Sequence, residues 1–78
     1  MNIGMLWYDP DPKVDLTIKV HRAAAYYAKK YGRVPNMAFV NPSDAPVKQA
    51  VKAGEIEIRV TRSVLPNHIW IGIKQVRQ

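Results

Sequence analysis

The segment from residue 13 to residue 31 constrains the fold most, because its apolar residues recur at the spacing of a helix that packs on one side. The expected apolar face comprises Leu16, Val20, Ala23, Ala24, Tyr27 and Tyr31. Asp11 suits the N-cap, with Pro12 in the first helical position. Gly32 and Pro35 predict the end of the helix at Tyr31. The alanines allow this helix to approach a sheet closely.

The residues on either side of this helix predict strands. Residues 3–8 are apolar with two aromatic side chains, and the prolines of the following Asp-Pro-Asp-Pro stop the strand. A second strand is expected over Met37–Val40. Ser43 would then cap a short helix over Asp44–Ala53, which Gly54 ends.

The last third of the chain alternates between apolar and polar residues. In residues 55–62 the inward set is Ile56, Ile58 and Val60, and in residues 68–76 it is Ile69, Ile71 and Ile73. Two such segments joined by a short polar connection predict an antiparallel hairpin.

The predicted order is therefore β-α-β-α-β-β, which places the chain in the α/β (α+β) class. We expect residues 1–78 to form a single domain, a two-layer sandwich. Its sheet would be small, mixed and four-stranded, with both helices on one face, a parallel β-α-β unit at the start and the antiparallel hairpin at the C-terminus.

The charge of the chain is uneven. Twelve Lys and Arg against six Asp and Glu give a net charge of +6. Residues 19–52 hold seven cations and one carboxylate, Asp44, so this stretch alone carries +6. Such a concentration favours a polyanionic partner, although small soluble proteins also carry charge for solubility.

The cations of the long helix share one side of it. At about 100° per residue, they fall with one tyrosine in an arc of about 100°. This candidate nucleic-acid-binding stripe consists of Lys19, Arg22, Tyr26, Lys29, Lys30 and Arg33. Lys and Arg would hold phosphates, and the tyrosine ring could stack on a base. The alternative is a solvated helix face, which has to be polar in any case.

A second candidate surface lies on the sheet face that the helices leave open. Its residues are Arg59, His68, Trp70 and Lys74. Aromatic and cationic side chains on a small sheet hold unstacked bases in several RNA-binding folds. The alternative is that Trp70 is covered by the N-terminal residues or by a second copy of the chain, as an interface anchor.

No pattern in the sequence indicates catalysis or metal binding. Ser43 is explained as a cap and Ser63 as a turn residue, and neither lies in a nucleophile elbow. There is no cysteine, and the two histidines, His21 and His68, lie in no ligand motif. The least unfavourable catalytic set is the Asp9 and Asp11 pair with Arg62 or His68. We therefore expect no enzyme activity, no metal and no cofactor.

The N-terminal apolar run is too short to span a membrane and lacks the basic leader of a secretory signal. A soluble, cytoplasmic protein with no membrane partner is expected.

Two blocks resemble small prokaryotic proteins that carry no assigned function. The first runs from Tyr31-Gly32-Arg33-Val34-Pro35-Asn36 through a strand to Asn41-Pro42-Ser43, and the second is Arg62-Ser63-Val64-Leu65-Pro66-Asn67-His68-Ile69-Trp70-Ile71-Gly72. The resemblance covers most of residues 13–73 and implies no activity, cofactor or partner.

The sequence thus favours a small basic binding module without catalysis, whose partner is DNA, RNA or another polyanion. The alternative is a protein-interaction protein, a homodimer or a heteromer, that makes contact through the sheet face or an edge strand. A third hypothesis is a regulator of a nucleic-acid enzyme that binds an acidic protein surface.

Overall fold

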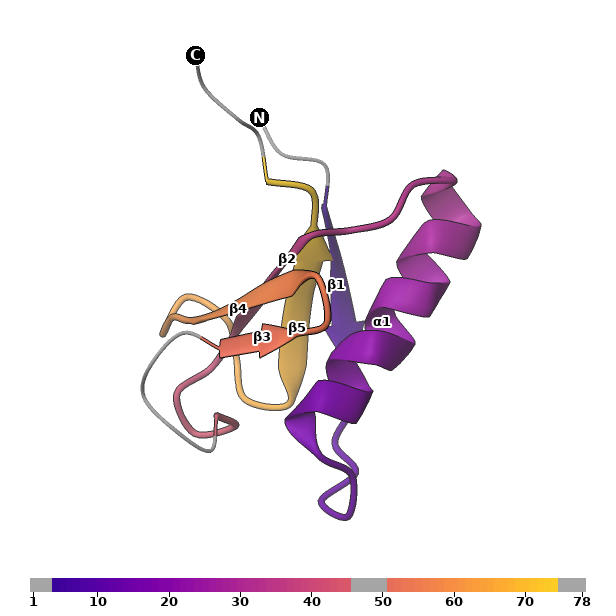
Figure 1. The fold of residues 1–78 in the computed structure, drawn as a ribbon. Helices are drawn as coiled ribbons and strands as arrows, with labels where there is room; N and C mark the ends of the chain where they lie inside the picture. Colours follow the sequence, from indigo (N-terminus) through magenta and orange to yellow (C-terminus); the bar gives the residue numbers. More distant parts are fainter. Residues whose placement is uncertain (1–3, 46–50, 75–78) are drawn as a thin grey trace.

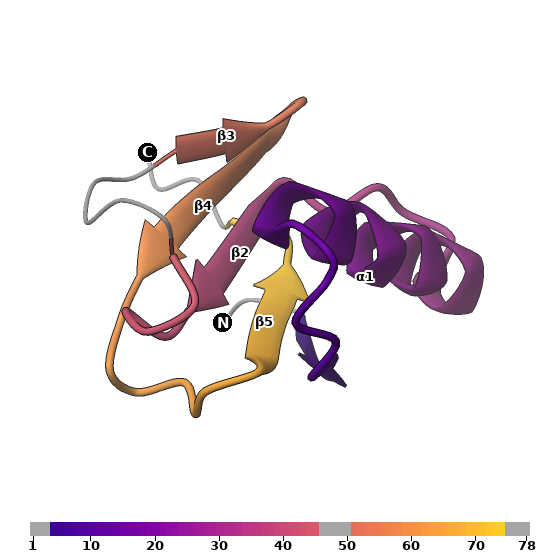
Figure 2. The same ribbon diagram turned by 90° about the horizontal axis from the view of Figure 1, so that it is seen from below.

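The computed structural model describes residues 4–45 and 51–74, and in these ranges it consists of one helix and a five-stranded mixed sheet. The elements in chain order are β1 (Gly4–Tyr8), α1 (Leu16–Tyr31), β2 (Met37–Val40), β3 (Val51–Ala53), β4 (Ile56–Val60) and β5 (His68–Gly72). Figures 1 and 2 show α1 as a second layer beside the sheet. The predicted two-layer α+β class is confirmed.

The strands lie in the order β1-β5-β2-β4-β3. β5 is antiparallel to both β1 and β2, so β1 and β2 run parallel with β5 between them. β4 is parallel to β2, and β3 pairs antiparallel with the outer side of β4. The two edges of the sheet are therefore β1 and β3.

The core lies between α1 and the sheet. From the helix it receives Val20, Ala23 and Tyr27, all fully buried. From the sheet it receives Ala38, Val40, Ile56, Ile58, Ile69 and Ile71. The inward sets predicted from alternation in the last two strands are thus confirmed, with Val60 and Ile73 packed partly buried at the margin.

The helix begins three residues later than predicted. Its N-cap is Asp15, which makes no side-chain cap hydrogen bond, and not Asp11. The carboxylate of Asp11 instead accepts a hydrogen bond from the Lys13 amide at 3.0 Å, which closes a turn before the helix. The predicted end is confirmed: Gly32 is left-handed at φ 72°, and its N–H donates to the Ala28 carbonyl.

The predicted C-terminal hairpin is wrong. β4 and β5 are not neighbours, because β2 lies between them and pairs with both. The hairpin that does form joins β3 to β4 through a turn at Gly54, whose φ is 62°. Alternation identifies the face of a strand but not its neighbour, which is why the sequence pattern led to the wrong pairing.

The predicted helix over Asp44–Ala53 is wrong at its C-terminal end, where Val51–Ala53 forms β3 and raises the sheet from four strands to five. The part of that prediction over residues 46–50 lies outside the described residues. In the described residues Ser43 belongs to a turn, where its N–H and hydroxyl both donate to the Asn41 side-chain oxygen, at 2.9 and 2.8 Å.

Candidate nucleic-acid interface

The basic stripe of α1 lies on the flank of the helix next to edge strand β1. The Tyr26 ring packs against Trp7 of β1, with ring centroids 5.3 Å apart. The opposite flank faces the other end of the sheet, because His21 lies beside Gly54 in the β3–β4 turn. The fold therefore directs the stripe toward the β1 edge of the molecule.

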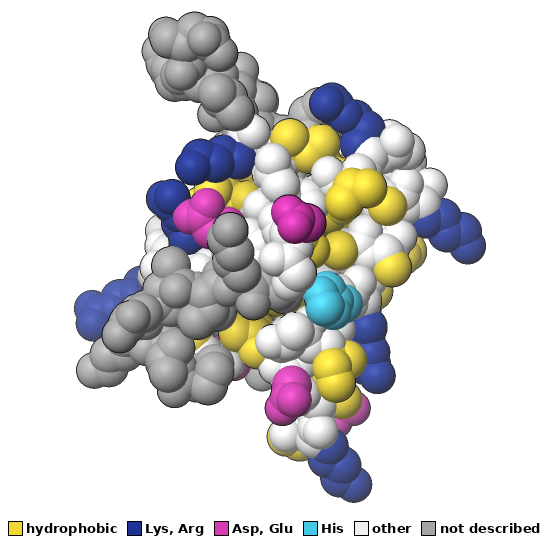
Figure 3. All heavy atoms as spheres, viewed as in Figure 1, with side chains coloured by type: hydrophobic (Ala, Val, Ile, Leu, Met, Phe, Trp, Pro, Cys, Tyr) yellow, Lys and Arg dark blue, Asp and Glu magenta, His cyan; other side chains and the backbone are white. Residues whose placement is uncertain are grey.

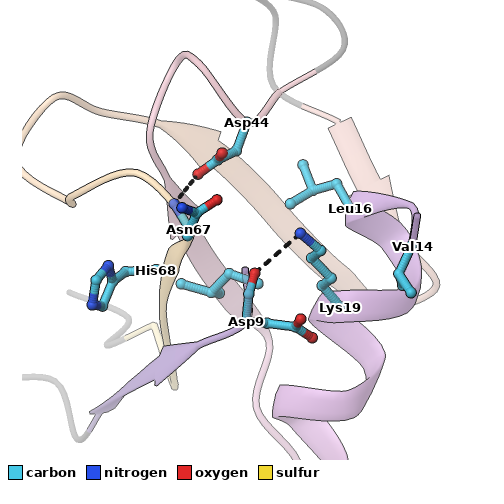
Figure 4. Close-up of a pocket in the computed structure, with 8 residues that line it drawn as sticks. Asp9, Val14, Leu16, Lys19, Asp44, Asn67 and His68 are labelled. Atoms are coloured by element: carbon cyan, nitrogen blue, oxygen red, sulfur yellow. Dashed lines mark hydrogen bonds between the residues drawn. The ribbon is translucent and has the colours of Figure 1, made fainter. Parts of the chain in front are cut away.

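Two of the five cations contact Asp9, in the connection between β1 and α1. Lys19 Nζ donates to the main-chain oxygen of Asp9 at 3.0 Å, as Figure 4 shows. Arg22 Nη1 lies 3.7 Å from the carboxylate of Asp9, whose side chain is 11% exposed. These two cations tie the β1–α1 connection to the helix, and Asp9 offsets part of their charge.

The remaining three cations, Lys29, Lys30 and Arg33, are exposed. The predicted place of Arg33 on the helical arc is wrong, because α1 ends at Tyr31 and the left-handed Gly32 turns the chain before Arg33. Within residues 4–45 and 51–74, none of them forms an ion pair. Lys30 Nζ lies 5.4 Å from the centre of the Tyr31 ring. Because no described carboxylate neutralises them, these cations are open to an anion from solution.

Tyr26, Lys29 and Lys30 line a shallow hollow of about 400 Å³. Tyr26 is 49% exposed, so one side of its ring rests on Trp7 while the rest is accessible. The hollow therefore combines an aromatic surface with two ammonium groups.

On the face of the molecule that Figure 3 shows, Lys and Arg side chains stand apart along the side where α1 lies, with hydrophobic and neutral atoms between them.

The second predicted surface is only partly assembled. Strand register places Leu6, Trp70, Phe39 and Arg59 in one row across the open face. The Trp70 ring packs against Phe39, with centroids 5.7 Å apart, and covers the Cα of Gly4. Trp70 is thus covered in part by N-terminal strand β1, one of the alternatives considered from the sequence.

The polar members of this surface have partners of their own. Arg59 forms an ion pair with Glu57, and Lys74 Nζ lies 4.0 Å from the same carboxylate. His68 packs on the Tyr8 ring, with centroids 4.9 Å apart, and its Nδ1 lies 2.9 Å from the Pro66 carbonyl. Arg59 and Trp70 share a row, and Lys74 is linked to Arg59 through Glu57. His68 lies in the next row of the same face, opposite Tyr8.

Sequence reasoning missed three residues of the open face, namely Leu6, Tyr8 and Phe39. Leu6 and Tyr8 are 59% and 60% exposed. The alternation of the first strand could have placed Gly4, Leu6 and Tyr8 on one face, but the apolar character of all the neighbouring residues hid this pattern. Asp9 was also missed as the partner of the stripe, and no local signal indicates that contact.

A small pocket of about 60 Å³ lies where the connections after β1, β2 and β4 meet (Figure 4). The Asp44 carboxylate accepts a hydrogen bond from the main-chain N–H of Asn67 at 2.7 Å. The main-chain carbonyl of Asn67 accepts one from the main-chain N–H of Asp9 at 2.9 Å. Asn67 has a positive φ of 66°. The polar groups here bind one another and hold the connections together.

The predicted least unfavourable catalytic set is not brought together in this pocket. Figure 4 shows the His68 ring pointing away from Asp9. The Asp9 carboxylate faces Arg22 and the Asp11 carboxylate closes the turn at Lys13.

Two further features bear on the class of site. Among the described side chains, no group of three or more His, Cys, Asp or Glu could hold a metal ion. In the same part of the chain, no helix is long and apolar enough to cross a membrane.

No protein-family model, no curated protein and no solved structure matches this chain. The resemblance of the two sequence blocks to small prokaryotic proteins stays a prediction, and function has to be inferred from the surfaces of the molecule.

Proposed function

We propose that the protein binds nucleic acid without sequence specificity, through phosphate contacts made by the exposed half of the α1 stripe. The observation that carries this proposal is that Lys29 and Lys30 line a hollow with the exposed Tyr26 ring. These two lysines and Arg33, which follows the C-cap, are exposed with no ion-pair partner among the described residues. Lys19 and Arg22 contribute less, because both are occupied by Asp9.

The helix dipole explains only part of the stripe. Lys29 and Lys30 lie in the last turn of α1, where cations stabilise the negative end of the helix dipole. Arg33 lies beyond the C-cap, and Tyr26 lies in the middle of the helix, so neither is explained by the dipole. An exposed aromatic ring beside unpaired cations is the combination that single-stranded nucleic acids and duplex backbones both accept.

The experiment is an anisotropy titration of labelled duplex DNA, single-stranded DNA and RNA at low salt. The variant Lys29→Gln/Arg33→Gln removes two charges from the stripe. The control variant Lys13→Gln/Arg62→Gln removes the same two residue types from exposed positions elsewhere.

We expect the stripe variant to bind at least one of these ligands about 10- to 100-fold more weakly than the wild type, because it loses two phosphate contacts and the counterions they release. The control variant should lose much less. Equal losses in the two variants, or no binding of any of the three ligands by the wild type, would overturn the proposal.

A further inference from the structure

Edge strand β1 has one hydrogen-bonding side that the described residues leave uncovered, and we propose that a second copy of this chain pairs there. The two β1 strands would join antiparallel about a two-fold axis through Leu6, so that two five-stranded sheets become one ten-stranded sheet. This pairing does not depend on nucleic-acid binding.

The hydrogen-bond pattern shows which main-chain groups of β1 face outward. Directly after the last pair of the β1–β5 ladder, the Asp9 main-chain N–H donates to the Asn67 carbonyl at 2.9 Å, so the main-chain groups of Asp9 face the β5 side. Hydrogen-bonded pairs alternate along an antiparallel ladder, so Trp7 and Met5 also bond to β5. The N–H and C=O groups of Gly4, Leu6 and Tyr8 therefore point away from the sheet.

In the described part of the chain, no hydrogen bond from outside the ladder reaches these outward groups. They form a row of alternating donors and acceptors, and the ligand that satisfies such a row is another extended strand.

The composition of β1 favours this pairing. Its five residues, Gly-Met-Leu-Trp-Tyr, contain no charge and no proline, the two features that usually block an edge. Leu6 and Tyr8 are 59% and 60% exposed and remain apolar surface to be buried. The other edge strand, β3, has three residues and offers a shorter row.

A second copy is the occupant that fits, because the row is complementary to itself. Antiparallel pairing about Leu6 sets Leu6 opposite the partner's Leu6 and Tyr8 opposite the partner's Gly4. By symmetry, Gly4 lies opposite the partner's Tyr8, and in all three pairs the outward main-chain groups of both strands form the hydrogen bonds. The Tyr8 ring would cover the partner's Gly4. It would lie next to the partner's Trp70, since within each copy the Trp70 ring already lies over Gly4.

The dimer would also create a larger basic surface, and this part rests on the proposed function. A two-fold axis perpendicular to the sheet keeps both α1 helices on the same face. The flank that carries Tyr26 lies beside β1 in each copy, so the two basic stripes would face each other across the joint. A polyanion between them would contact cations of both copies.

The facing stripes predict how the dimer responds to salt. Like charges on the two helices oppose association at low ionic strength, and both added salt and bound polyanion relieve that repulsion. We therefore expect the association constant of the dimer to increase with salt concentration in the absence of nucleic acid. An oligonucleotide should produce the same strengthening at low salt.

The test is sedimentation equilibrium of the full chain over a range of concentrations and salt. Leu6→Lys and Leu6→Glu place like charges opposite each other at the two-fold axis, and each variant alone should dimerise at least ten-fold more weakly than the wild type. An equimolar mixture of the Leu6→Lys and Leu6→Glu variants should form a heterodimer, because the introduced lysine of one copy then faces the introduced glutamate of the other. Leu65→Lys, at an exposed position in the β4–β5 connection, is the matched control and should dimerise like the wild type.

Circular dichroism of each variant establishes that it is folded. A folded wild type that stays monomeric at high salt, high concentration and with added oligonucleotide overturns the pairing. A wild-type dimer that both Leu6 variants leave unchanged also overturns it, because the contact would then lie elsewhere. A monomer that binds nucleic acid contradicts the dimer alone, and a dimer that binds none contradicts the proposed function alone.

Discussion

Gly4 lies in direct contact with the Trp70 ring. A β-carbon at this position would lie 2.0 Å from Cζ2 of Trp70, which is much closer than van der Waals contact allows. On its other side the ring packs against Phe39, with centroids 5.7 Å apart, so withdrawal from Gly4 would disturb this contact. The absence of a side chain at Gly4 thus allows the aromatic cluster of the open face to form.

Replacing Gly4 with alanine should lower the free energy of unfolding by about 1 to 3 kcal/mol, the usual cost of forcing an extra methyl group into a packed site. Urea denaturation measures this loss. The same substitution in a Trp70→Ala background should cost much less, because the clashing ring is gone. A Gly4→Ala penalty that is equal in the two backgrounds would show that Trp70 is not its cause.

The role of Asp9 could not be predicted from its neighbours in the sequence. It is 9% exposed, and its carboxylate faces Arg22 while also accepting a hydrogen bond from the Asp11 amide at 3.3 Å. Arg22 is half exposed, so solvent screens much of the ion pair.

Asp9→Ala should therefore cost about 1 to 2 kcal/mol, mainly from the lost hydrogen bond and packing. Asp15→Ala is the control, because Asp15 is exposed and makes no side-chain cap bond, and it should change stability by less than about 0.5 kcal/mol. Thermal unfolding of both variants is the measurement. An Asp9 variant as stable as the Asp15 variant would contradict the role given to this carboxylate.

At the scale of the elements, the helix could be predicted and the strand order could not. The 3.6-residue period, the glycine stop and the proline after it are local signals, and they located the C-terminus of α1 correctly. Its start was misplaced because Asp11 and Asp15 both suit an N-cap, and only the turn at Lys13 decides between them.

Strand pairing depends on contacts between distant residues. The alternation of β4 and β5 placed Ile58 and Ile71 in the core, but it contains no information that β2 would lie between these strands. β3 was missed because Val51–Ala53 continues a helical spacing, and its strand conformation comes from pairing with β4. Tertiary context decides short segments of this kind.

Ile71 tests the packing of β5, the strand that joins the two halves of the sheet. Its side chain is fully buried beneath α1. Ile71→Ala should cost about 2 to 5 kcal/mol, which is a large part of the total stability of so small a domain. Leu65→Ala, at a position 66% exposed, should change stability by less than about 0.5 kcal/mol. An Ile71 variant that unfolds at the same urea concentration as the Leu65 variant would contradict the inward orientation of β5.

At the scale of the whole molecule, residues 4–45 and 51–74 form one helix on a five-stranded sheet, and these residues leave the opposite sheet face and the β1 edge open. The residue types of the candidate interface could be predicted from the helical wheel. The division of the cations into paired and unpaired ones could not be predicted, because Asp9, far from most of them in sequence, contacts Lys19 and Arg22. The location of the stripe beside an open edge also appears only in the fold, through the contact of Tyr26 with Trp7.

The salt dependence of nucleic-acid binding tests the central claim most directly, namely that the exposed cations at the C-terminal end of α1 and just beyond it contact phosphates. The logarithm of the duplex-DNA binding constant should fall linearly with the logarithm of salt concentration. Each phosphate contact adds about 0.9 to the slope, so Lys29→Gln/Arg33→Gln should reduce it by up to about 1.8. Lys13→Gln/Arg62→Gln should leave the slope near that of the wild type. Identical slopes for the wild type and the stripe variant would contradict the claim.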